Sequence, residues 1–240
     1  MKSMVNSLLE GLFPQHCCLC GLPSPGERPL CAPCAAELAP NCHACTRCAL
    51  PLPAGDGAPR LCGHCLQRPP AFERVVAPWL YSDHLGHLIH LWKYRGETRL
   101  TGLLAQLWLE GPADPGEVDL LVPVPLHWRK QWRRGFNQSE LLARRLLRLR
   151  PGLAPGGVAN RVARRSRATR PQSGMDAEQR RHNLRGAFTS QGGCASLRLA
   201  VVDDVLTTGT TADTLAQVLL AAGASRVEIW CLARTPAPGS

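Results

Sequence analysis

Two patterns of apolar and polar residues alternate along this chain, one typical of helices and one typical of buried strands. Four segments carry the apolar pattern of helices: 84–92, 98–110, a helix that opens at Asn137, and 211–222. Four apolar or β-branched runs predict strands: 72–81, 119–125, 197–202 and 226–233. The last helix lies between the last two strands, and a strand–helix–strand unit implies parallel pairing. The expected fold class is therefore α/β, a parallel sheet flanked by helices.

Three further stretches lack that periodicity. Residues 50–70 are rich in Pro and Gly and end an N-terminal module, so the expected domains are 1–70 and 71–240. Residues 161–181 form a basic, polar loop long enough to have a function of its own. Residues 1–13 suit a short amphipathic helix better than a signal peptide, because they lack a long apolar core and a small-residue cleavage site.

Positive charge is concentrated in one part of the chain. The formal net charge is +10, but Pro125 to Phe188 alone has 16 Arg and Lys against three acidic residues. Such a patch suits a phosphate-rich ligand or nucleic acid, and the plain alternative is an ordinary solvated face. No run approaches the 18 apolar residues of a membrane span, so a cytoplasmic protein is expected.

Ten of the twelve cysteines lie between Cys17 and Cys65, and eight of them form four Cys-x-x-Cys pairs. Each pair places two thiolates on one tight turn, and two pairs complete a tetrahedral set of four. Zinc is the expected metal in a reducing compartment, at about two structural ions per chain, although four thiolates can also hold iron or an iron–sulfur cluster. Pairing along the chain predicts two ligand sets: Cys17, Cys20, Cys31 and Cys34, then Cys45, Cys48, Cys62 and Cys65.

That assignment leaves alternatives open. Cys18 and Cys42 are spare thiols, and Cys42 forms a fifth Cys-x-x-Cys with Cys45. His16, His43 or His64 could replace one thiolate. No open coordination position is indicated, so both sites are interpreted as structural.

The candidate site for chemistry follows the predicted strand at 197–202. Asp203 and Asp204 come at the carboxyl edge of the sheet, where ligands of α/β proteins bind. Next comes a turn rich in hydroxyls, in which glycine lets the backbone approach an anion: Thr207, Thr208, Gly209, Thr210 and Thr211. The helix that follows points its N-terminus at the same place, which stabilises a phosphate. Acids for sugar hydroxyls beside a phosphate cradle predict a ribose 5-phosphate site, whereas the bland alternative is a capped helix start.

The stretch 199–211 resembles the signature of type I phosphoribosyltransferases, which bind phosphoribosyl pyrophosphate (PRPP). The whole chain resembles the ComF/GntX family, in which a Cys-x-x-Cys module precedes such a domain. Further matches are Lys93-Tyr94-Arg95-Gly96-Glu97, Arg134-Gly135-Phe136-Asn137-Gln138, and Gln172 with Arg180, Asn183 and Ala187-Phe188.

The resemblance implies a role for each matched position. Asp203 and Asp204 would be the catalytic pair that binds the ribose hydroxyls, and 207–211 would hold the 5′-phosphate. Lys93, Tyr94 and Arg95 would form the pyrophosphate turn. Arg133, Arg134 and the arginines around Gln172 would add anion donors, with 166–181 as a lid. Mg²⁺ would accompany PRPP, held mostly by ligand oxygens.

Two functions remain open at this stage. One is transfer of phosphoribose to an acceptor that the sequence does not identify. The other is a non-catalytic protein on the same fold, which senses PRPP or handles single-stranded DNA with the competence machinery, as the resemblance to ComF proteins implies. Aromatic residues in the basic segment are few, which is thin for base stacking.

Overall fold

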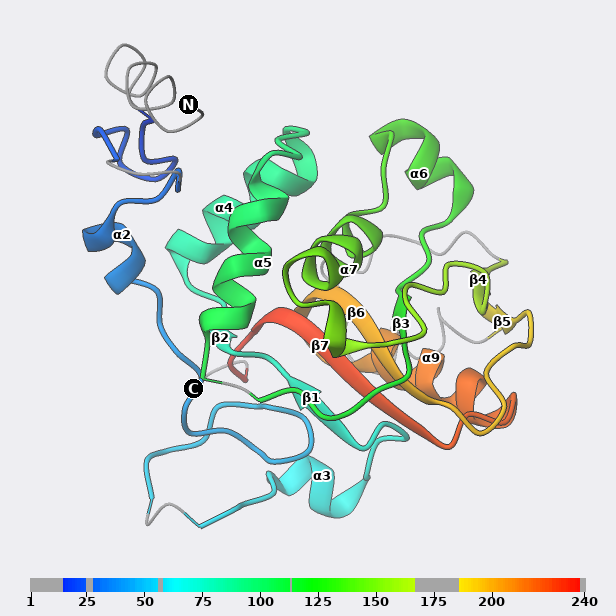
Figure 1. Cartoon of the computed structure of the whole chain (residues 1–240). Coiled ribbons are helices and arrows are strands. Elements are labelled where there is room, and N and C mark those ends of the chain that lie inside the picture. Colours follow the sequence, from blue (N-terminus) through cyan, green and yellow to red (C-terminus); the bar gives the residue numbers. More distant parts are fainter. Residues whose placement is uncertain (1–14, 25–27, 56–57, 113, 167–185, 238–240) are drawn as a thin grey trace.

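A computed structural model of the 240-residue chain describes residues 15–24, 28–55, 58–112, 114–166 and 186–237. Its centre is a parallel sheet in the order β1–β7–β6–β3, and β2 also pairs with β7 (Figure 1). The strands are β1 (Arg74–Val76), β2 (Trp79–Leu80), β3 (Leu120–Pro123), β6 (Arg198–Leu206) and β7 (Arg226–Arg234). The predicted α/β class with a parallel sheet is confirmed.

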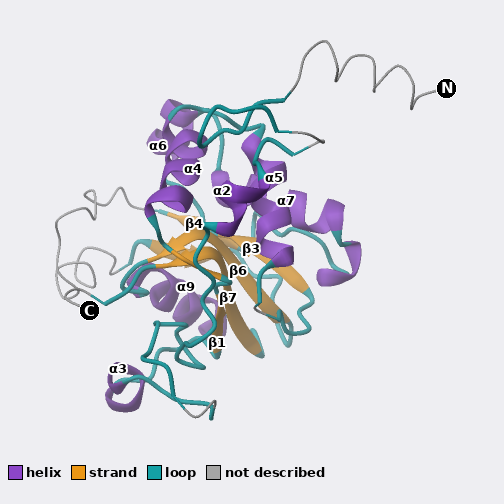
Figure 2. Ribbon diagram, turned by 90° about the vertical axis from the view of Figure 1, so that its left-hand side faces the viewer, coloured by secondary structure: helices purple, strands orange, loops and turns teal. Residues whose placement is uncertain are grey.

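Helices cover both faces of this sheet (Figure 2). One face packs against α4 (Asp83–Tyr94), α5 (Leu100–Glu110) and α7 (Gln138–Leu149), in a core that includes Trp92, Trp108 and Trp230. The other face packs against α9 (Thr210–Ala221), in a second core that includes Phe72, Leu215 and Ile229. The central strands are apolar on both sides because each face is buried.

Several predicted boundaries shift for local reasons. The predicted strand at 72–81 is split into β1 and β2 around Ala77-Pro78, because proline has no N–H to donate to the sheet. The predicted strand at 197–202 continues through both aspartates to Leu206, which pairs with Arg234 of β7. The predicted end of this strand, at Val202, was therefore four residues too early. Asn137 caps α7 as expected, its side chain accepting a hydrogen bond from Ser139 N at 3.1 Å.

Other elements were not predicted. Helix α6 (Trp128–Arg134) ends at Gly135, whose φ of 80° is left-handed. Within the predicted loop 161–181, β4 (Ala163–Arg165) forms an antiparallel ribbon with β5 (Phe188–Ser190). The expected helix at 1–13 and all but Ser166 of the expected lid at 166–181 lie outside the described residues.

The cysteine-rich segment touches both faces of the α/β unit. Its two short helices are α2 (Ala32–Ala36) and α3 (Gly63–Gln67), which lie far apart in Figure 1. The connection between them runs beside β2, where Leu80 N donates to Ala39 O at 2.9 Å and Asn41 N donates to Pro78 O at 2.8 Å. One end of the segment therefore reaches the α4–α5 face and the other end reaches the α9 face.

Candidate functional site at the carboxyl edge of the sheet

The cysteines form two compact sets. The Sγ atoms of Cys17, Cys20, Cys31 and Cys34 lie within 4.8 Å of one another, and so do those of Cys45, Cys48, Cys62 and Cys65. Within the sets, Cys20 and Cys31 have their Sγ atoms 3.7 Å apart, and those of Cys48 and Cys62 are 3.6 Å apart. Zn–S bonds of about 2.3 Å in a tetrahedron put sulfur atoms roughly 3.8 Å apart, so both sets fit zinc. The structure groups the cysteines in the two sets that pairing along the chain predicts.

The candidates left open at the sequence level lie outside these sets. Cys18 donates instead to Pro29 O at 2.8 Å, and Cys42 is exposed. The three neighbouring histidines belong to neither set within the described residues. Each site is therefore built from four cysteines.

Hydrogen bonds from backbone N–H groups lower the pKa of one cysteine in each set. Burial raises the pKa of Cys17, but hydrogen bonds from the backbone of Cys20, Cys31 and Leu19 outweigh burial and lower it to about 6. The same balance, with backbone groups of Cys48, Cys62 and Arg47, lowers the pKa of Cys45 to about 7. A thiolate at neutral pH is the form that binds metal.

The two aspartates predicted to be catalytic lie near the carboxyl end of β6. Asp204 is buried and forms an ion pair with Lys93, the basic residue near the end of α4. Asp203 accepts a hydrogen bond from Ser139 Oγ at 3.3 Å, at the start of α7. Two helices on one face of the sheet thus deliver a cation and a hydroxyl to this acidic pair.

The acidic pair carries unequal charge. Burial and the neighbouring Asp204 charge raise the pKa of Asp203 to about 7, while Lys93 partly opposes them. Burial also acts on Asp204, but the Lys93 ammonium outweighs it and lowers the pKa of that carboxyl. Asp204 is therefore charged at neutral pH, whereas Asp203 gains or loses its proton near pH 7.

The predicted phosphate turn follows directly. Gly209 has a φ of 77° and precedes the first residue of α9, so glycine is needed there. Thr208 Oγ1 and Thr210 Oγ1 are 2.9 Å apart, and Thr207 and Thr208 are exposed. Hydroxyls and the N-terminus of a 12-residue helix converge at this turn. Thr211 lies in the first turn of the same helix.

The predicted pyrophosphate turn lies at the end of α4 and is joined to the acidic pair through Lys93. Tyr94 is exposed, with the Lys93 ammonium 5.8 Å and the Arg134 guanidinium 5.4 Å from its ring centre. Arg134 reaches this place from the end of α6 and also donates to Gln138. Arg95 caps α4 through its backbone N–H and is exposed, and within the described residues no contact joins it to the aspartates.

Sequence reasoning missed a buried arginine behind the phosphate turn. Arg234 is 6% exposed, and its guanidinium donates to the carbonyls of Leu206, Thr207 and Thr235. Its Nε donates to Cys48 O at 3.0 Å, so it ties the second cysteine set to the phosphate turn. A charged residue directly after the apolar run 229–233 was the available signal.

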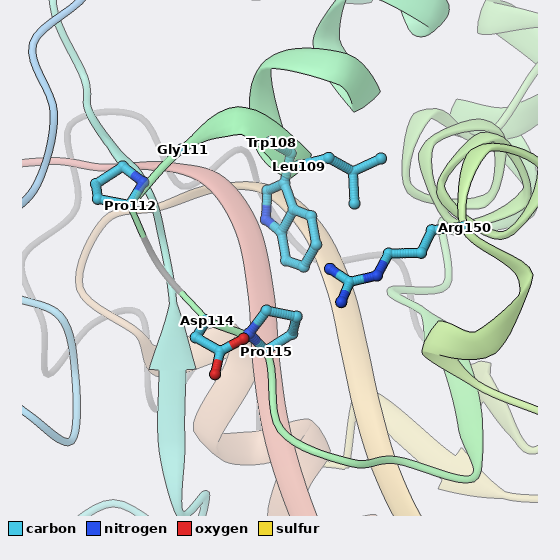
Figure 3. Close-up of a pocket in the computed structure, with 7 residues that line it drawn as sticks. All are labelled: Trp108, Leu109, Gly111, Pro112, Asp114, Pro115 and Arg150. Atoms are coloured by element: carbon cyan, nitrogen blue, oxygen red, sulfur yellow. The ribbon is translucent and has the colours of Figure 1, made fainter.

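One hollow of the surface lies away from the carboxyl edge of the sheet. It has a volume of about 200 Å³ and lies between the end of α5 and the segment that leads to β3 (Figure 3). Arg150 extends there toward Trp108 and Pro115, and Asp114 is the one acid of its lining. The acidic pair and the phosphate turn do not contribute to it, so the carboxyl edge remains the candidate site.

Across the described residues, no helix has the length and apolar character to cross a membrane.

These features define an α/β protein whose parallel sheet has an acidic and threonine-rich carboxyl edge, joined to a module with two Cys₄ sites. Residues 8–66 match the double zinc ribbon domain. The chain is 37% identical to the DNA utilization protein YhgH of Salmonella typhi over 233 residues, covering 92% of this chain and 98% of that protein. Identity is 34% to the protein of the same name from Escherichia coli K12 over 229 residues, with coverages of 92% and 98%. Competence protein F of Haemophilus influenzae is 33% identical over 184 residues, with coverages of 72% and 78%.

The chain therefore belongs to the family of these DNA utilization and competence proteins, the ComF/GntX family. Among solved structures, the allosteric regulatory enzyme of purine biosynthesis matches 56% of this chain and 25% of its own, at 18% identity and a TM-score of 0.36.

Proposed function

We propose that this protein binds PRPP with Mg²⁺ at the carboxyl edge of its sheet and transfers the phosphoribosyl group to an acceptor. The observation that carries the proposal is one juxtaposition. Asp203 and Asp204 lie near the carboxyl end of the central strand β6, which stops at Leu206 just before Thr207, and the phosphate turn opens α9. Lys93 completes the site from the opposite helix layer. Acids for ribose hydroxyls, a cradle for a 5′-phosphate and cations for pyrophosphate then lie side by side.

Each group has a distinct part in this proposal. Asp203 and Asp204 accept hydrogen bonds from the ribose hydroxyls, and residues 207–211 donate to the 5′-phosphate. Lys93, Tyr94, Arg95 and Arg134 surround the pyrophosphate. Oxygen donors of the acidic pair suit Mg²⁺, which would neutralise charge on the leaving pyrophosphate. Asp203, with a pKa near 7, is the carboxyl whose ionisation an arriving cation would favour.

The remaining parts of the proposal concern organisation and setting. A division near residue 70 separates the zinc module from the phosphoribosyl domain. The setting is the cytoplasm, where reduced thiols remain available for zinc. The zinc ions are structural, because four cysteines at each site leave no coordination position for a substrate.

A second candidate function is handling of single-stranded DNA, and one surface favours it. Trp128 and Trp132 stand one turn apart on α6 and are 62% and 86% exposed. Arg129 lies with its guanidinium 5.2 Å from the Trp128 ring centre, and α6 carries four basic residues and no acid. Exposed aromatic rings among cations are suited to stacked bases and phosphates. The relatives' names, DNA utilization protein and competence protein, point the same way.

The test is calorimetric titration of the zinc-loaded full chain with PRPP–Mg²⁺, beside single-stranded DNA. Asp203→Asn with Asp204→Asn should weaken PRPP binding by two decades or more, since each lost charge-assisted hydrogen bond is worth about 1.5–3 kcal/mol. DNA binding should stay equal or strengthen, because negative charge is removed.

A matched control removes the same charge at the other edge of the sheet. Asp114→Asn with Glu117→Gln should leave PRPP affinity unchanged, because Glu117 pairs with Arg198 at the start of β6. If the site variant, folded as judged by its melting temperature, binds PRPP like the parent, the site assignment is wrong. If the parent binds DNA tightly and no PRPP, the transferase proposal fails.

A further inference from the structure

The two cysteine sets differ in how much of their sulfur is reachable from solvent. In the first set, Cys20 is exposed, and Cys31 and Cys34 are partly buried. In the second set, three of the four members are buried, with exposed fractions of 2%, 5% and 3%: Cys45, Cys62 and Cys65. Cysteine oxidation follows exposure and thiolate character. A small oxidant dissolved in water therefore meets the first set more readily than the second.

A hollow of about 660 Å³ gives a second approach to the first set. It lies at the start of α5, and Cys17 and Cys18 line it together with His16 and Arg99. Cys17 is the buried member of the set, with 2% of its surface exposed. The first set is therefore open at Cys20 and is also bordered by a hollow at Cys17.

Hydrogen bonds to sulfur also distinguish the two sets. In the second set, Cys62 N donates to Cys45 Sγ at 3.3 Å, and Cys65 N donates to Cys62 Sγ at 3.5 Å. In the first set, backbone donors converge on Cys17, the buried member. A hydrogen bond draws electron density from sulfur and lowers its reactivity toward oxidants. The second set borders a cavity as well, but its buried sulfur atoms carry these bonds.

Two cysteines of the first set lie in position to form a disulfide. Cys20 and Cys31 belong to different Cys-x-x-Cys turns, and their Sγ atoms are 3.7 Å apart. A disulfide has an S–S length of about 2.05 Å, so the two sulfur atoms need to approach by less than about 2 Å. Turns at the surface can make that adjustment without disturbing the sheet.

We propose that the first cysteine set is a site of reversible oxidation by peroxide, and that Cys20 and Cys31 form its disulfide. The proposal does not depend on the phosphoribosyl function. The Cys20 thiolate attacks hydrogen peroxide, so that an S–O bond forms, the O–O bond breaks and hydroxide leaves. The Cys31 thiolate then attacks the Cys20 sulfur, an S–S bond forms, and the second oxygen leaves as hydroxide. Two thiolates are oxidised by two electrons in total, and the peroxide is reduced to two hydroxide ions.

Loss of two thiolates removes the first zinc site but spares the second. The first set packs with Leu30 and Leu38 in the core that contains α4 and α5. Oxidation therefore loosens residues 17–38 from this side of the sheet. The second set stays joined to the phosphate turn through Arg234, which donates to Cys48 O. The site of oxidation and the candidate site thus lie in separately anchored parts of the cysteine-rich module.

The test treats the zinc-loaded full chain with hydrogen peroxide. A chromogenic chelator measures released zinc, and mass spectrometry after alkylation maps the disulfides. One ion should leave at least about tenfold faster than the other, together with formation of the Cys20–Cys31 disulfide. Cys62→Ser, which empties the second site, should release its one remaining ion at the fast rate. Cys42→Ser is the matched control, because Cys42 is exposed but belongs to neither set, and it should behave like the parent.

The remaining outcomes decide against the proposal or in its favour. Equal release rates for the two ions, or a first disulfide within residues 45–65, would overturn it. Cys20→Ser should retain its one ion under the same peroxide treatment, and rapid loss there would also contradict the assignment. A dithiol reductant with added zinc should restore about two ions to the oxidised parent, and failure to do so would refute reversibility. If Cys62→Ser does not fold, the disulfide map of the parent decides alone.

Discussion

The two Cys₄ sites share one plan, a Cys-x-x-Cys turn followed by a Cys-x-x-Cys at a short helix, but they contact different parts of the molecule. The first site packs through Cys17, Leu30 and Leu38 against the α4–α5 side, and its Cys20 is exposed. The second site has three buried cysteines and lies against the phosphate turn through Arg234. The first copy of this metal-binding unit thus packs against helices that cover the sheet, and the second copy lies beside the phosphate turn of the candidate site. The Cys-x-x-Cys spacing determines each metal site, whereas tertiary contacts determine which part of the molecule that site stabilises.

The largest expected effect separates the two sites by removing one ligand from each. Cys62→Ser and Cys20→Ser should each reduce bound zinc from about two ions to about one, because each removes one of the four thiolate ligands of a site. The effect is large because zinc binding supplies folding free energy of order 10 kcal/mol in small zinc modules. PRPP affinity should fall at least tenfold in Cys62→Ser and change little in Cys20→Ser. Metal analysis with calorimetry measures both quantities. Equal loss of PRPP affinity in the two variants would show that the two sites play no different roles.

A smaller effect tests the link between the second site and the phosphate turn. Arg234→Met keeps much of the side-chain volume but removes the guanidinium that donates to the carbonyls of Cys48 and Thr207 and, beside Thr235 N, to that of Leu206. Stability should fall by roughly 2–5 kcal/mol, since buried acceptors lose their partners. Chemical denaturation measures the loss, and Arg28→Met is the comparison at the first site. Arg28 pairs with Glu110 at 2.7 Å on a half-exposed surface, which is worth below about 1 kcal/mol. Similar losses in the two variants would contradict the assigned difference.

The third effect is a dependence of stability on pH, which is smaller per pH unit than the loss expected for Arg234→Met. The folded pKa of Asp203, about 7, exceeds the ordinary value, so the folded state binds more protons than the unfolded state between about pH 4 and 7. Stability of the ligand-free protein should therefore fall as pH rises through that window, by at most about 1.4 kcal/mol per unit from this group. Asp203→Asn should flatten that fall and raise the melting temperature at pH 8 but not at pH 4. An unchanged pH profile in the variant would rule out a raised pKa for this carboxyl.

The sequence was most informative where chemistry is local. The Cys-x-x-Cys spacing and the run from Asp203 to Thr211 each place their groups within a few residues, so their positions follow from one turn or one strand end. The extension of β6 was missed because charged residues rarely end a buried strand, and the side chains that pair with these two, Lys93 and Ser139, are distant in sequence.

Elements held by distant contacts escaped prediction. Helix α6 has no buried face to give an apolar period, since both of its tryptophans are exposed. Strands β4 and β5 have three residues each, and they pair across more than twenty positions. Arg234 could be noticed as a charge after an apolar run, but its role depends on carbonyls from two other segments.

The most direct test of the account is amide hydrogen exchange of the zinc-loaded chain with and without PRPP–Mg²⁺. The ligand should slow exchange at residues 207–211 and at the end of α4 around Lys93. This protection should extend to the second cysteine set through Arg234. Residues 17–34 of the first set should exchange at the same rate in both states. Absence of protection at 207–211, or protection confined to α6, would contradict the claim that this edge of the sheet is a phosphoribosyl site.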